Sequence, residues 1–219
     1  CLEVASGRHD VSLAIGVDKY GDQKRAVMKE GINRLSETST IPLVKYALLC
    51  RTLARKKGLS AEDLARVACK NHNNAATNPF AQFQKHRTLE QVLTSTHVAG
   101  DLTSLQCTPR GEGAAAAIVI SEDAMREFGL DAERAIRVAS STAGSEMLPE
   151  GREPGSVLAA RDVALRTYRD AGITAQDLDV VELHDAFSIE EILYTEAIGL
   201  CTVGEGHHYL REGRSAIGG

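Results

Sequence analysis

Short apolar runs alternate along the chain with longer stretches in which apolar residues recur every three or four positions. The runs at 11–17, 113–120 and 178–183 are short and apolar enough to be strands buried within a sheet. The stretches at 42–58 and 157–172 have the spacing of one helical face. Strands that alternate with helices usually form a mostly parallel sheet covered on both faces. The sequence therefore predicts an α/β fold.

Capping residues mark where further helices begin. Ser60, followed three residues later by Asp63, resembles a capping box and predicts a helix that runs to about Ala76. Similar signals predict three shorter helices, at 88–97, 121–129 and 188–199.

Residues 19–108 read as one mostly helical insertion between two strands. The composition from Asp18 to about Thr40 is polar and glycine-rich, which favours an irregular connection. A second irregular connection is expected at 143–155, where glycine and proline gather, and the preceding residues 134–142 are strand-like.

Composition excludes several classes of protein. The chain carries 25 basic and 30 acidic residues, and this net charge of -5 argues against a nucleic-acid binder. No run approaches the roughly 18 to 20 apolar residues that a membrane span needs. Because no signal-peptide pattern opens the chain, a cytoplasmic location is expected. The cysteines are odd in number, scattered and without a CxxC pair, which argues against a disulfide framework or a zinc ribbon; they are Cys1, Cys50, Cys69, Cys107 and Cys201.

The most informative stretch is 179–201, DVVELHDAFSIEEILYTEAIGLC. Here an apolar strand is expected to end at His184 and Asp185, with a helix beginning within four residues. Ligands of open α/β sheets gather beyond the carboxyl ends of strands, and a histidine there can transfer a proton or donate an N–H to an oxyanion. The alternative is a buried structural histidine. Asp185 is expected to orient the loop or accept backbone N–H bonds, and Phe187 to pack beneath it.

Four segments resemble the SCP2-type thiolases, the branch of the thiolase superfamily associated with sterol carrier protein. They lie in the family's order and cover nearly the whole chain: SGRHDVSLAIGVDKYGD at 6–22, NPFAQF at 78–83, LTSLQCTPRGEGAAAAIVISE at 102–122 and LHDAF with EEILYTEAIGLC at 183–201. The resemblance implies transfer of an acyl group between coenzyme A (CoA) thioesters. It implies an acyl-CoA substrate, no permanently bound cofactor and no metal.

The resemblance also implies a thiolase-like fold, layered α/β/α with an inserted loop domain and incomplete at both ends. On this division, 1–18 and 109–130 end the N-terminal half, 19–108 form the loop domain, and 131–219 begin the C-terminal half. The family's nucleophilic cysteine is expected about eleven positions before Cys1, at a helix start whose dipole lowers the thiol pKa. Its GHP histidine and second cysteine are expected after 219. The 219-residue piece alone is therefore predicted to be inactive.

Of the catalytic groups that the resemblance implies, His184 is the one present in the chain. It would lie beside the thioester carbonyl and form part of an oxyanion hole. Cys107 and Cys201 are expected to be small packed side chains rather than substitute nucleophiles, and Cys50 and Cys69 to belong to the core. The adjacent pair at 207–208, His207 and His208, is expected in an exposed loop without a metal.

Two other functions remain open. Relatives called lipid-transfer proteins include aldolases that cleave the side chain of steroid CoA esters, lack the nucleophilic cysteine and work with a small OB-fold partner. The third possibility is a non-catalytic subunit or scaffold of a heteromeric complex. As a thiolase, the intact protein is expected to be a homodimer or tetramer, cytoplasmic or, in a eukaryote, peroxisomal.

Overall fold

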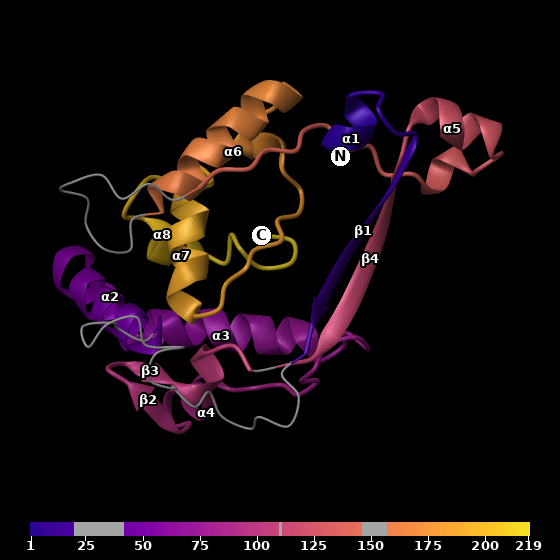
Figure 1. Ribbon diagram of the computed structural model, residues 1–219. Helices are drawn as coiled ribbons and strands as arrows, with labels where there is room; N and C mark the ends of the chain where they lie inside the picture. The colour runs from indigo at the N-terminus through magenta and orange to yellow at the C-terminus, as the bar shows by residue number, and fades with distance from the viewer. Residues whose placement is uncertain (20–41, 110, 146–156) are drawn as a thin grey trace, which may run out of the picture.

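The computed structural model describes residues 1–19, 42–109, 111–145 and 157–219. Two long strands form a ribbon that stands apart from a body of packed helices (Figure 1). The ribbon consists of Val11–Asp18 (β1) and Gly113–Ile120 (β4), and the short helices Leu2–Ala5 (α1) and Glu122–Glu127 (α5) lie near its upper end. The strands predicted at 11–17 and 113–120 and the helix predicted at 121–129 are present. The burial expected of the two strands is wrong, because they form a two-stranded ribbon in which Leu13 is 58% and Ile118 70% exposed.

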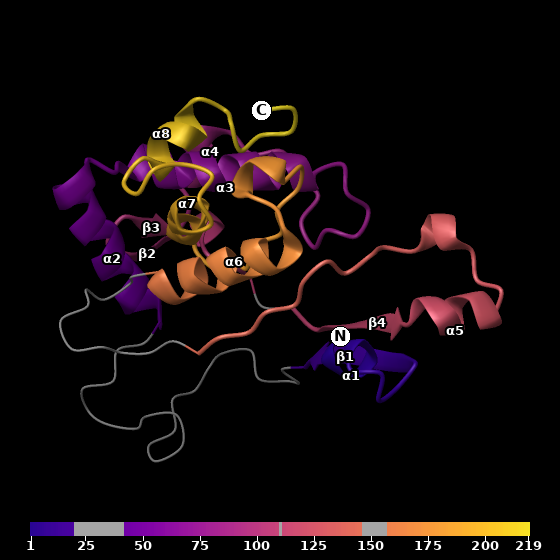
Figure 2. The same ribbon diagram turned by 90° about the horizontal axis from the view of Figure 1, so that it is seen from above.

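The helical body is built around one central helix, α7, which contacts α3, α6 and α8 (Figure 2). Its helices are Pro42–Lys57 (α2), Ala61–Ala75 (α3), Leu158–Ala171 (α6), Ser188–Ala197 (α7) and Gly206–Arg211 (α8). Ser60 and Asp63 form the expected capping box at the start of α3. Gly172 ends α6 with a φ of 71°, a conformation that other residues rarely adopt.

The helix predicted over 88–97 is shorter than expected and is followed by a small β-hairpin. The helix Leu89–Leu93 (α4) is capped by Thr88 but ends early, and His97–Ala99 (β2) pairs with Leu102–Thr103 (β3). Gly100, with a φ of 55°, turns the chain between these strands. Single-turn 3₁₀ helices lie at other points of the described chain, Ser104–Gln106, Ala132–Arg134 and Ala175–Asp177.

The hydrophobic core lies where α2, α3, β3 and α7 meet. Its side chains include Cys50, Leu64 and Leu102, each at most 1% exposed, together with Ile189, Ile192 and Leu193 from the inward face of α7. Helix α7 confirms the helix predicted over 188–199. Among the described residues, no helix combines the length and the apolar character that crossing a membrane requires.

The expectation of a mostly parallel sheet is wrong for the described residues, whose two sheets are antiparallel pairs. The strands expected at 134–142 and 178–183 are likewise not formed. A strand requires a hydrogen-bonded neighbour, and these segments pair with none in the described chain. Their apolar side chains are exposed to solvent, Ile136 to 90% and Val180 to 78%. The irregular connections expected at 18–40 and 143–155 lie largely outside the described residues.

The central helix α7 buries three glutamates. Glu190, Glu191 and Glu196 are each at most 7% exposed. Each has a partner on a neighbouring element: the hydroxyl of Tyr46 donates to Glu190 Oε1 at 2.7 Å, and Lys70 and Lys57 pair with Glu191 and Glu196. These buried contacts join α2 and α3 to α7.

Replacing Tyr46 with phenylalanine is expected to lower the free energy of unfolding by about 1.5 kcal/mol, because a buried carboxylate loses a donor. The aromatic ring and its stacking on Phe187, at 4.3 Å between centroids, are kept. Urea unfolding of Tyr46→Phe measures the loss. Tyr209→Phe, which keeps the ring under Arg214, serves as the control, and equal losses in the two variants would contradict the assignment.

Candidate functional site

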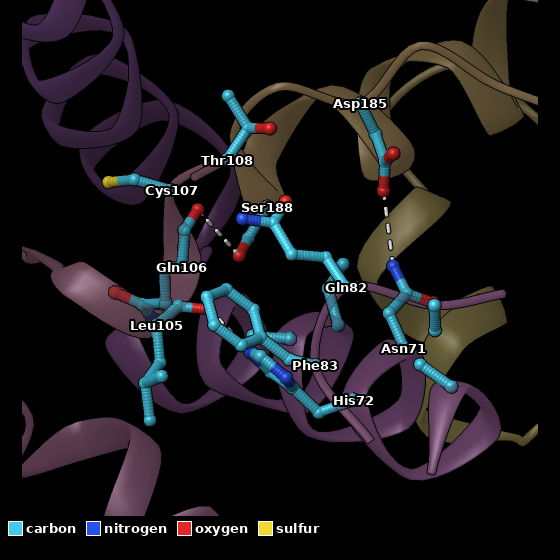
Figure 3. A pocket seen from close by; sticks show the side chains of 14 residues that line it. Asn71, His72, Gln82, Phe83, Leu105, Gln106, Cys107, Thr108, Asp185 and Ser188 are labelled. Carbon is cyan, nitrogen blue, oxygen red and sulfur yellow. Dashed lines mark hydrogen bonds between the residues drawn. The ribbon is translucent and has the colours of Figure 1, made fainter. Parts of the chain in front are cut away.

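One cavity of about 260 Å³ gathers residues from four separate parts of the chain. The second half of α3 forms one wall, and the segments 81–83, 105–108 and 185–188 form the others (Figure 3). The lining residues are Val67, Ala68, Asn71, His72, Ala75, Ala81, Gln82, Phe83, Leu105, Gln106, Cys107, Thr108, Asp185 and Ser188. The last three of these segments belong to, or adjoin, three of the motifs on which the family resemblance depends.

Hydrogen bonds fasten the loop before α7 to the segment at 105–108. The amide of Thr108 donates to the carbonyl oxygen of Ala186 at 2.8 Å, and Ser188 Oγ donates to that of Gln106 at 3.3 Å. Cys107 and Phe187 form an antiparallel bridge at the same place. The two motifs are thus held together although about eighty residues separate them along the chain.

A polar network occupies the end of the cavity near α7. Asn71 Nδ2 donates to Asp185 Oδ2 at 3.1 Å and to Glu191 Oε2 at 3.0 Å. Lys70 Nζ lies 3.1 Å from Glu191 Oε1. Burial raises the pKa of the Asp185 carboxyl, and the nearby Glu191 adds to this rise. Figure 3 shows Asn71 and Asp185 facing each other on the right, with Leu105 and Cys107 on the left.

The three predicted site residues lie in three different environments. His184 is exposed and is not part of the cavity wall, so a buried structural role for it is wrong. Asp185 lines the cavity and accepts from a side-chain amide. Phe187 packs behind the loop, stacked on Tyr46, and its amide donates to Glu190 Oε2 at 3.1 Å. The loop therefore presents His184 outward, next to an Asp185 that faces the cavity.

Cys107 touches the cavity, but its thiol belongs to the core. Its sulfur donates to the carbonyl oxygen of Thr103 at 3.4 Å and points away from the other labelled side chains in Figure 3. Burial raises the pKa of Cys107, and it raises the pKa of Cys50 to about 12 and that of Cys201 to about 11. A raised pKa lowers the fraction of reactive thiolate. This environment supports a packing role for Cys107.

Alkylation with iodoacetamide at pH 8 is expected to label the exposed Cys1 first and Cys50 more than about 100-fold more slowly. Cys107 and Cys201 should also lag behind Cys1, and their rates should rise only as the pH is raised further. Mass spectrometry of peptides from timed samples measures each rate. A Cys107 that reacts as fast as Cys1 would instead mark it as an activated nucleophile.

The histidine pair does not lie in a loop, as the sequence predicted, but in α8. His207 is buried while His208 is exposed, and their rings are 4.1 Å apart. Burial lowers the pKa of His207. Within the described parts of the chain, no group of three His, Cys, Asp or Glu side chains could hold a metal ion.

Sequence reasoning missed the contribution of α3 to the cavity. Asn71 and His72 follow the apolar stripe of that helix, and nothing in the local pattern distinguishes them from solvated residues. Gln82 and Phe83 had a signal, since they belong to the NPFAQF motif. The described residues of the cavity wall combine apolar side chains with amides, hydroxyls, one thiol, the imidazole of His72 and one carboxylate, and include no lysine or arginine. Such a cavity suits a neutral group with hydrogen-bonding atoms better than a phosphate.

Comparisons with known proteins point to one family. The family described as "Thiolase C-terminal domain-like" matches residues 140–219. Benzoylsuccinyl-CoA thiolase subunit BbsB of Thauera aromatica is 35% identical over 227 residues, which cover 99% of this chain and 57% of the relative. An acetyl-CoA acetyltransferase of Methanothermobacter thermautotrophicus is 35% identical over 100% of this chain and 58% of the relative. Sterol carrier protein 2 of Bos taurus is 32% identical over 99% and 43%.

Solved structures show the same fold. The structure of an "Ltp2-ChsH2(DUF35) aldolase" has a TM-score of 0.83 and 25% identity, covering 100% of this chain and 59% of that one. A monomeric SCP2-thiolase-like protein from Mycobacterium smegmatis has a TM-score of 0.71 and 22% identity, covering 91% and 44%. The chain thus spans about half the length of the relatives it matches. It has a thiolase-like α/β fold and belongs to the thiolase superfamily, with sterol carrier protein 2 among its relatives.

Proposed function

We propose that the protein containing this chain is a CoA-dependent acyltransferase of the thiolase type, which cleaves or condenses acyl-CoA thioesters. In this function, a ring N–H of His184 donates to the thioester carbonyl oxygen, where negative charge develops as a nucleophile adds to the carbonyl carbon. The resemblance to the family assigns the nucleophile to a cysteine outside these 219 residues. The activity is therefore proposed for the whole protein.

The observation that carries the proposal is the convergence of the motif segments at 78–83, 102–108 and 183–188 on one cavity. The cavity adjoins the loop of His184, and Asp185 is the one carboxylate among its described lining residues, beside apolar, amide and hydroxyl side chains and the imidazole of His72. An acyl group or the amide-bearing arm of CoA fits such a wall, while the charged phosphates of CoA would remain outside.

Incubating the full-length protein with a 3-oxoacyl-CoA and free CoA tests the proposal. Thiolysis breaks the bond between the second and third acyl carbons, consumes one CoA thiol and yields acetyl-CoA and an acyl-CoA two carbons shorter. Chromatography of the thioesters is expected to show both products in equal amounts. Absence of cleavage, or cleavage that consumes no free CoA, would contradict the proposal.

The aldolase alternative is favoured by one specific observation, the TM-score of 0.83 to a structure that is named as an aldolase. An aldolase would split a 3-hydroxyacyl-CoA into a carbonyl compound and a shorter thioester without consuming free CoA. The same chromatography, with a 3-hydroxyacyl-CoA as substrate, separates the two activities. A protein that performs neither reaction would fit the third possibility, a non-catalytic subunit.

A partner protein forms part of the proposal. The Thauera relative is named as a subunit, and the aldolase is named for two components, one of them a DUF35 protein. Both names support a complex, with an OB-fold protein as the expected partner if the protein is an aldolase. A homodimer or tetramer and a cytoplasmic or peroxisomal location stay predictions.

A further inference from the structure

The side-chain amide of Asn71 joins the loop that carries His184 to helix α7. Its Nδ2 donates to Asp185 Oδ2 and to Glu191 Oε2, at 3.1 and 3.0 Å, while its Oδ1 accepts from Lys70 Nζ at 2.7 Å. Figure 3 shows the bond to Asp185 at the edge of the cavity. Both N–H groups and the carbonyl oxygen of the amide are thus used.

A neutral amide is the residue type that this position requires. With its oxygen and nitrogen exchanged, the amide would turn its oxygen toward two carboxylates and its N–H groups toward an ammonium, so the charges around it select the orientation. An aspartate at position 71 would keep the shape but add a third carboxylate between Asp185 and Glu191. An aliphatic side chain would leave both carboxylates without this donor.

The bond to Asp185 reaches a part of the loop that the other bonds do not. The amide of Thr108 holds the carbonyl of Ala186, and the Phe187 amide is held by Glu190, so both fasten the end of the loop next to α7. Asn71 holds the residue directly beside His184. A shift of about 1 Å at a catalytic group can lower a rate about 100-fold, so this anchor bears on catalysis.

We propose that Asn71 is a positioning residue for His184: by fixing the Asp185 carboxylate, it sets the direction in which the neighbouring imidazole meets the substrate. The inference rests on the acyl-transfer function proposed above. Asn71 itself touches no reacting atom and acts through Asp185.

Asn71→Asp in the full-length protein tests the inference, because it keeps the shape of the side chain and removes its donors. Asn73→Asp is the matched control: Asn73 lies on the same helix and makes two hydrogen bonds to the backbone of Arg87, 2.8 and 3.2 Å long, away from the loop. Asn71→Asp is expected to lower kcat about 10- to 100-fold with little change in KM. Asn73→Asp should change kcat less than about 3-fold at a similar cost in Tm.

Hydrogen exchange of the Phe187 and Thr108 amides gives a readout that needs no activity. Both amides are expected to exchange at least about 10-fold faster in Asn71→Asp, and to keep their rates in Asn73→Asp. Unchanged exchange in Asn71→Asp, or equal effects of the two variants on exchange and kcat, would overturn the inference. Absence of His184-dependent turnover in the wild type would mean that the proposed function has failed, and faster exchange in Asn71→Asp would then still support the anchoring of the loop.

Discussion

Replacing His184 with alanine in the full-length protein is expected to lower kcat about 100- to 1,000-fold, the usual cost of losing one oxyanion donor. The donor acts as negative charge develops on the thioester oxygen, so the loss should appear in kcat more than in KM. Steady-state rates of 3-oxoacyl-CoA thiolysis measure both constants. His184 is exposed, and the free energy of unfolding should change by only about 0.5 kcal/mol.

Two variants make this result specific. His184→Gln keeps an N–H donor on a side chain of similar reach and is expected to recover part of the rate. His86→Ala removes an exposed histidine outside the residues that line the cavity and should leave kcat within about 2-fold. A His184→Ala protein with full thiolase activity would remove His184 from the mechanism and leave the cavity without its proposed oxyanion donor.

Helices whose signals are local could be predicted from the sequence. The capping box of Ser60 and Asp63 starts α3 as expected, and α7 forms within the helix predicted over 188–199. In both cases, residues within one or two turns decide the structure. Helix α8 has no such signal, since neither a side-chain cap nor a long apolar stripe marks Gly206–Arg211. Helix α8 instead contacts α3, which is far from it in the sequence.

Strands depend on neighbours that a local pattern cannot supply. Residues 178–183 are as apolar as β1, yet only β1 has a partner, β4, among the described residues. The cavity could be predicted only in part, because its residues also come from distant parts of the chain. Asp185 was a predicted site residue and Gln82 lies in a motif of the resemblance, whereas Asn71 acquires its role from two carboxylates more than a hundred residues away.

Replacing Asp63 with alanine is expected to lower the free energy of unfolding by about 2 to 4 kcal/mol, because a helix cap and the charge-assisted bonds from Arg211, whose side chain is 40% exposed, are lost. Asp63 is 1% exposed and receives two bonds from Arg211 in α8, Nε to Oδ1 at 2.6 Å and Nη2 to Oδ2 at 2.7 Å. It also accepts from the amide and hydroxyl of Ser60 at 2.8 and 2.7 Å. One carboxylate thus both caps α3 and attaches α8. Urea unfolding of Asp63→Ala and of the wild type measures the loss of stability.

The same carboxylate makes stability depend on pH. Burial alone would raise the pKa of Asp63, but the hydrogen bonds from Arg211 and Ser60 outweigh it and lower the pKa to about 2 from its ordinary 3.8. A lowered pKa in the folded state means that the stabilisation is complete above about pH 4 and is lost as the pH falls toward 2. Asp63→Asn should remove this acid-dependent part of the unfolding free energy.

Glu62, the neighbour of Asp63, provides the matched control. It is exposed and pairs with Arg66 one turn along α3, an ion pair worth at most about 0.5 kcal/mol. Glu62→Ala should therefore unfold at almost the wild-type urea concentration and keep the acid-dependent loss. Arg211→Ala should reproduce most of the Asp63→Ala effect, because it leaves the buried carboxylate without its cation. Equal, small losses in Asp63→Ala and Glu62→Ala would show that the pair does not hold α8 on α3.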